Sequence, residues 1–131
     1  PVEMYGTGNQ TRTFTHGIDI ANAFKLSLEK KSAVNQIFNV SGDKEFKIIQ
    51  ILEKIWEFTS QNKKLRVKHL TPLKDDVQRR YPSNKKIKKT LGWKPMIKFD
   101  DGLKETIQWI QIVFMEFILL LLIIILLEIS M

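Results

Sequence analysis

The apolar residues of positions 1–110 change their spacing repeatedly along the chain, and this pattern constrains the fold more than any other feature. Residues 20–28 and 48–58 repeat at helical spacing, whereas residues 36–40 and 65–70 have the short apolar patterns of strands. Chains that alternate helices and strands in this way belong to the α/β class. With 131 residues and no cysteine, we expect one domain with a hydrophobic core and no disulfide framework.

Polar residues mark where several of these elements begin and end. We expect Asp19 to cap the first helix. A short lysine-rich helix is predicted to start at Ser83 and to stop at Gly92, and the last helix to begin at Asp100. The residues expected to face the core are Ile20, Ala23, Phe24 and Leu28 in the first helix and Ile87 and Leu91 in the short one.

The composition changes abruptly at residues 111–131, which we predict to form a hydrophobic C-terminal helix beyond a domain of residues 1–110. A membrane-spanning helix needs about 20 predominantly apolar residues. Residues 112–127 are at the short limit and contain Glu116. Three interpretations stay open: a membrane anchor, a helix buried in an oligomer interface, and a sequence with no selected structure. Lysines before the tail favour a cytoplasmic location for the domain.

The positive charge is concentrated in one region of the chain. The net charge is +7, and residues 63–98 contain thirteen Lys or Arg against Asp75 and Asp76. Such a region attracts polyanions. Proteins that bind single strands interleave aromatic and basic residues, and here only Tyr81 and Trp93 are aromatic, so nucleic-acid binding is not expected.

The sequence does not predict a metal site. His16 and His69 are the only histidines, and cysteine is absent. Neither histidine has a carboxylate at a spacing typical of metal ligands. We therefore expect no bound metal.

A glycine-rich bend near the start of the chain leads directly to an arginine. Gly6 and Gly8 allow the backbone to turn with positive φ and to lie close to a ligand. Arg12 follows and offers a planar fork of donors that suits two phosphate oxygens. The residues alone leave two interpretations open: a phosphate-binding turn, and an ordinary surface turn with a solvated arginine.

Five short motifs in order give the chain a resemblance to the extended short-chain dehydrogenase/reductases. They are Val2–Arg12, with a strand, a glycine turn and "QTR"; Phe14–Ala21; Ile37–Gly42; Tyr81–Pro95, with "LGWKP"; and Gly102–Trp109, with "GLKETIQW". Together they resemble the C-terminal part of the NAD-dependent nucleotide-sugar epimerases and dehydratases, such as UDP-glucose 4-epimerase. The resemblance implies a small substrate-binding α/β subdomain without the Rossmann domain.

The resemblance also implies roles for individual residues. Arg12 would hold the diphosphate of a nucleotide sugar, Tyr5 would line the nucleotide, and Asp76 would face the ribose. The chain has Leu73 where relatives carry a second arginine, so that contact is expected to be lost. Lys74 could replace it as a point charge, although without a bidentate fork.

The motifs that carry the family's hydride chemistry are a glycine-rich dinucleotide turn and a Tyr-x-x-x-Lys pair. The glycine-rich turn does not occur in this sequence, and the one Tyr-x-x-x-Lys spacing, Tyr81 to Lys85, lies inside the C-terminal motif Tyr81–Pro95. We expect no catalytic or cofactor-binding residue here, with NAD belonging to the complete enzyme and a Rossmann-domain portion as partner. The chain would then be a fragment that is inactive alone. The alternatives are a degenerate membrane-anchored or partner-binding module, and a basic polyanion binder.

Overall fold

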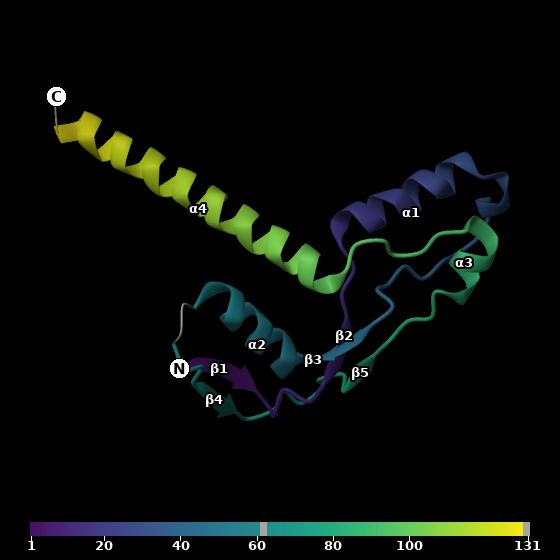
Figure 1. Ribbon diagram of the computed structural model, residues 1–131, viewed down its shortest axis with the longest axis horizontal. Coiled ribbons are helices and arrows are strands. Elements are labelled where there is room, and N and C mark those ends of the chain that lie inside the picture. Colours follow the sequence, from purple (N-terminus) through teal and green to yellow (C-terminus); the bar gives the residue numbers. More distant parts are fainter. Residues whose placement is uncertain (61–62, 130–131) are drawn as a thin grey trace. The chain divides into compact units, whose positions relative to one another are not determined.

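The computed structural model describes residues 1–60 and 63–129, and the side chains of residues 1–60 and 63–119. The chain divides into two compact units, Pro1–Phe99 and Asp100–Met131. Within the described residues the first unit contains five short strands and three α-helices (Figure 1). The predicted α/β class is confirmed.

The strands of the first unit form two small sheets. In the first sheet, β1 (Val2–Tyr5) pairs in parallel with β4 (Val67–Leu70). In the second, β2 (Thr11–Thr13) lies between β3 (Glu45–Lys47), which is antiparallel to it, and β5 (Arg79–Arg80), which is parallel. The strand predicted over 65–70 is confirmed as β4, with the half-exposed character that its alternating sequence indicates.

The predicted helices of the first unit are present, with small shifts at their ends. They are α1 (Gly17–Glu29), α2 (Ile48–Thr59) and α3 (Lys85–Leu91). A 3-10 turn that the sequence does not predict, η1 (Lys31–Ala33), follows α1. α3 ends at Gly92, which has a φ of 70° in the left-handed region, as predicted. It begins later than expected, because Asn84 and not Ser83 is its N-cap. The Asn84 side chain binds the Ser41 backbone, donating to its carbonyl at 2.5 Å and accepting from its N–H at 3.0 Å.

The second unit is built from a single long helix, α4 (Phe99–Ile129). It begins one residue before the predicted Asp100 and includes most of the hydrophobic segment 111–131. The side chains of residues 120–131 lie outside the described residues. Among the residues that are described, no helix has both the length and the apolar character to cross a membrane. Because residues 120–127 of the predicted tail lie outside the described side chains, the three interpretations of the tail stay predictions.

A small hydrophobic cluster forms the core of the first unit. Ala23, Ile87, Leu91 and Trp93 are buried together, and the last three are each only 1% exposed. Leu26, Ala33, Phe38 and Val40 pack against this cluster. The predicted inward positions of α3 are confirmed, and the cluster joins α1 to the segment that follows α3.

Asp19 connects α1 to the same segment by hydrogen bonds and does not cap the helix as predicted. The helix begins earlier, and the His16 side chain caps it by accepting from the Ile18 N–H. Asp19 is 2% exposed, and its carboxylate accepts from the backbone N–H groups of Met96 and Ile97 at 3.0 and 3.1 Å. Its carbonyl accepts from the Trp93 indole at 2.9 Å. Buried polar groups need hydrogen-bond partners, and these three partners of Asp19 lie far along the chain, in residues 93–97.

Two expectations for the first 40 residues are wrong. Residues 36–40 form no strand, and Ile37 is 87% exposed. Helix α1 turns Ala23 inward but leaves Phe24 and Leu28 exposed at 68% and 88%. The helical spacing predicts the helix itself correctly. The core cluster, however, contacts a neighbouring stripe of the helix that includes Asp19.

Two glycines occupy places that a side chain would disturb. Gly8 has a φ of 75°, and a Cβ there would lie 2.4 Å from the Met4 sulfur. At Gly42 a Cβ would lie 2.2 Å from the carbonyl oxygen of Phe14, the residue that follows β2. The predicted positive φ of the opening bend is confirmed, since Gly6 also has a φ of 69°.

Replacing Asp19 should destabilise the first unit. In Asp19→Ala two part-buried backbone N–H groups lose their charged acceptor, which should lower the free energy of unfolding by about 2–3 kcal/mol. Asp19→Asn keeps one acceptor oxygen and should recover part of this loss. Urea denaturation followed by tryptophan fluorescence measures the effect. Glu29→Ala, in the exposed pair with Lys25 on the same helix, is the control and should change stability by less than about 0.5 kcal/mol.

Candidate functional site

The register of the three-stranded sheet sorts its charged residues onto two faces. Arg12 on β2 pairs with Arg80 on β5, and Thr11 pairs with Arg79. Since successive side chains of a strand point to opposite faces, Arg12 and Arg80 share one face and Arg79 lies on the other. The side chains of adjacent arginines 79 and 80 therefore meet different surroundings.

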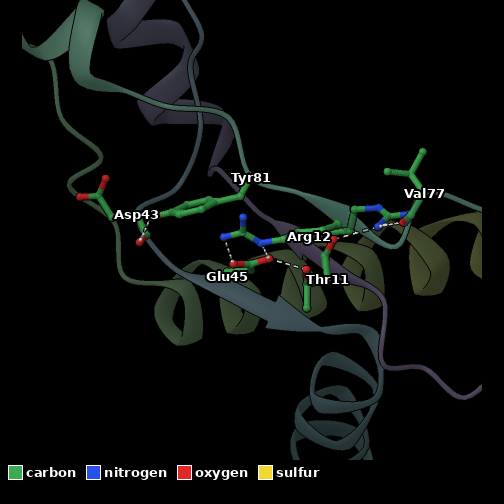
Figure 2. A network of polar contacts seen from close by, with 7 residues as sticks. Thr11, Arg12, Asp43, Glu45, Val77 and Tyr81 are labelled. Carbon is green, nitrogen blue, oxygen red and sulfur yellow. Dashed lines mark hydrogen bonds and ion pairs between the residues drawn. The ribbon is translucent and has the colours of Figure 1, made fainter.

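Arg12 is held in place by three groups of the protein. Its Nη1 donates to the carbonyl oxygens of Thr11 and Val77, at 2.8 and 2.5 Å, and its Nη2 donates to Asp76 Oδ1 at 3.0 Å. Figure 2 shows the side chain reaching along the sheet toward Val77. The Arg12 and Asp76 side chains are only 23% and 19% exposed. The guanidinium is therefore fixed before any ligand arrives, and it keeps N–H groups that the described residues do not use.

On the opposite face, Arg79 and Glu45 form a bidentate ion pair. The Arg79 Nε and Nη2 atoms lie 2.9 Å from the two Glu45 carboxylate oxygens. The Thr11 hydroxyl also donates to Glu45 (Figure 2). These hydrogen bonds, from Arg79 first and then Thr11, hold the pKa of Glu45 below its ordinary value. Both charges of this pair are satisfied within the sheet.

A cavity of about 430 Å³ opens on the face that carries Arg12. It is lined by Arg12, Arg80 and residues 73–77, the turn that leads into β5. Two arginines and Lys74 face two aspartates there, so its lining carries a net positive charge. A cavity of this size and sign suits a small anionic ligand.

The structure brings two of the three predicted site residues together. Arg12 and Asp76 are in direct contact at this cavity. Tyr5 ends β1, is 52% exposed, and is not among the residues that line the cavity; nor are Gly6 and Gly8 among the described lining residues. The glycine bend instead connects β1 to β2.

Sequence reasoning missed Arg80. It lies next to Arg12 only because β5 pairs with β2, and nothing in the two-residue strand Arg79–Arg80 signals that pairing. The one available signal was the run of basic residues around Asp76, from which the sequence predicts only a general attraction for polyanions.

The glycine bend does not form the kind of cradle that holds the pyrophosphate of NAD. A dinucleotide pyrophosphate is held where a glycine turn leads into a helix and the helix N-terminus faces the phosphates. Here the bend leads into β2, and its carbonyls at Gly8 and Gln10 accept the first N–H groups of α2, from Ile49 and Ile48, at 3.0 Å each. That helix end is thus already occupied by the chain itself.

Comparison with known proteins gives a consistent match. The family model described as GDP-mannose 4,6 dehydratase matches residues 1–106. UDP-glucuronate 4-epimerase of Thermodesulfobacterium geofontis is 35% identical over 113 residues, which cover 83% of this chain and 33% of that protein. The chain spans between 16% and 33% of the length of the curated relatives compared with it.

Solved structures give the same match for the fold. UDP-glucose 4-epimerase of Thermotoga maritima, solved with UDP-glucose, has a TM-score of 0.78 and 26% identity, over 86% of this chain and 35% of that one. dTDP-glucose 4,6-dehydratase of Bacillus anthracis, in complex with NAD, has a TM-score of 0.73 and 28% identity. The match covers 83% of this chain and 34% of the dehydratase chain. The α/β fold of the first unit is therefore part of a larger known fold.

The Glu45 pair should make stability depend on pH. Because the pKa of Glu45 is lowered by folding, the pair stabilises the native state fully above the ordinary pKa of a glutamate. That stabilisation should be lost as the pH falls through the lowered value. Urea denaturation between neutral and acidic pH measures it, with Glu45→Gln as the matched variant. An equally steep acid loss in Glu45→Gln would assign the effect to other carboxylates.

Proposed function

The chain belongs to the GDP-mannose 4,6-dehydratase family of NAD-dependent epimerases and dehydratases, and we propose that it binds a nucleotide sugar through the diphosphate. In this proposal residues 1–110 are the substrate-binding C-terminal subdomain of such an enzyme, and residues 111–131 are a separate hydrophobic tail. The similar protein from Thermotoga maritima was solved with UDP-glucose, which supports a nucleoside diphosphate sugar as the ligand class.

The observation that carries the proposal is the fixed position of Arg12 at the cavity. Three protein groups hold the guanidinium, so binding a diphosphate costs little side-chain entropy. A planar fork of donors matches two phosphate oxygens better than an ammonium does. The positive net charge of the cavity lining adds attraction for a dianion.

Asp76 and Tyr5 have supporting roles in this proposal. Asp76 uses Oδ1 for Arg12, and none of the described residues occupies its Oδ2, which leaves an acceptor for a ribose hydroxyl. Tyr5 is half-exposed at the end of β1 and offers an aromatic face to the nucleotide. Arg12 and Asp76 would thus hold adjoining parts of one ligand.

We further propose that the chain binds substrate without transforming it. The glycine bend does not lead into a helix as a dinucleotide cradle does, and the one Tyr-x-x-x-Lys spacing of the sequence, Tyr81 to Lys85, has its tyrosine hydroxyl donating to the Asp43 carbonyl at 3.2 Å. Hydride transfer with NAD would need a Rossmann-domain portion, on the same or another polypeptide. The chain by itself is then an inactive fragment whose contribution to the complete enzyme is its grip on the diphosphate.

Replacing Arg12 should weaken nucleotide-sugar binding. Arg12→Lys keeps the charge but loses the fork, and should raise the Kd for UDP-glucose by about tenfold or more, as expected for loss of a charge-assisted hydrogen bond. Isothermal titration calorimetry measures the Kd. Lys68→Gln is the control. Lys68 lies on β4 and forms an exposed ion pair with Glu3 of β1, so this variant should leave the Kd unchanged. Equal affinities for wild type and Arg12→Lys would contradict the proposed role.

The purified chain should be unable to interconvert nucleotide sugars. Incubated with NAD and UDP-glucose, it should form neither UDP-galactose nor a 4-keto sugar, as followed by proton NMR. The intact epimerase of Thermotoga maritima is the positive control under the same conditions. Turnover by this chain alone would overturn the proposal that it is catalytically incomplete.

A further inference from the structure

The Arg12 site has suitable geometry but little free charge. Asp76 lies 3.0 Å from the Arg12 guanidinium and neutralises it, because both side chains are mostly buried and shielded from solvent screening. A diphosphate carries at least two negative charges, so a neutral pair attracts it weakly. Another cation within the cavity is needed, and Leu73 does not supply one.

Arg80 meets this need by its position in the sheet. It is the register partner of Arg12 on the adjacent strand and lines the same cavity. Neighbouring strands lie about 4.8 Å apart, so two arginines paired in this way reach adjacent points of one small ligand. The two phosphates of a diphosphate are adjacent points of that kind.

The three arginines of the sheet differ in their partners. Arg12 is paired with Asp76, and Arg79 is paired with Glu45 on the opposite face. For Arg80, no ion pair or side-chain hydrogen bond occurs with any residue that the structure describes. It is thus the arginine whose full charge and donor set are free, and it is the one beside Arg12 in the cavity.

We propose that Arg80 is the second phosphate-binding arginine of this site, and that it supplies the charge that the neutralised Arg12 cannot. The inference rests on the proposed nucleotide-sugar function and assigns its diphosphate to two residues with different tasks. Arg12 presents fixed donors to one phosphate. Arg80, which is exposed and unpaired, closes on the other phosphate when the ligand enters.

Lys74 is the competing candidate for the second cation. It lines the same cavity, but it lies in the turn before β5, next to Asp75, and no strand register places it beside Arg12. Its ammonium is also a strongly hydrated point charge, whereas the guanidinium of Arg80 binds two oxygens of a phosphate at once. Both features favour Arg80.

The test measures binding of two probes, UDP-glucose and inorganic pyrophosphate, by isothermal titration calorimetry at two salt concentrations. Arg80→Gln should weaken binding of both probes by about tenfold and make the Kd less dependent on salt. Arg79→Gln is the matched control, since it removes the same charge from the neighbouring residue on the other face. Lys74→Gln tests the competing cation. Circular dichroism establishes that each variant is folded.

The possible outcomes separate the two proposals. If UDP-glucose binds the wild type and Arg80→Gln behaves like Arg79→Gln, or if only Lys74→Gln weakens binding, the role of Arg80 is overturned and the proposed function stands. If Arg80→Gln weakens pyrophosphate binding but UDP-glucose binds no more tightly than pyrophosphate, the role of Arg80 stands and the nucleotide-sugar function falls. If neither probe binds the wild type, both proposals are overturned.

Discussion

The first unit depends on one buried aspartate that uses both its backbone and its side chain. Asp19 receives the Trp93 indole on its carbonyl and the N–H groups of residues 96 and 97 on its carboxylate. These bonds hold α1 against the segment after α3, and the core cluster around Trp93 fills the space between them. The first unit buries few apolar side chains, so these hydrogen bonds contribute much to its unique structure. Each of them uses an acceptor atom of Asp19 that no other core residue replaces.

The candidate site depends on strand register, as the core of the first unit depends on Asp19. The pairing of β2 with β5 places two arginines on the cavity face and sends Arg79 to the other face, where Glu45 binds it. One residue of slip would exchange Arg79 and Arg80 and put the paired arginine in the cavity. In a sheet of such short strands, the register of β2 and β5 therefore decides which arginine faces the cavity.

Local patterns in the sequence predicted α2, the inward residues of α3 and its end at Gly92, because each depends on neighbours within a turn or two. The predictions that are wrong all concern residues whose partners lie far along the chain. Asp19 has the composition of a helix cap, yet its partners come from residues 93–97. Residues 36–40 have the composition of a strand, but no described strand pairs with them. Arg12 was identified from its chemistry, whereas Arg80 could be identified only from the register of β5.

Gly42 also constrains the candidate site, although glycine has no functional side chain. Its α-carbon lies against the carbonyl of Phe14, and Phe14 follows directly on the strand that carries Arg12. Any side chain at this position would have to displace that strand end. The position of the strand that carries Arg12 therefore depends on residue 42 having no side chain, whether or not a ligand binds.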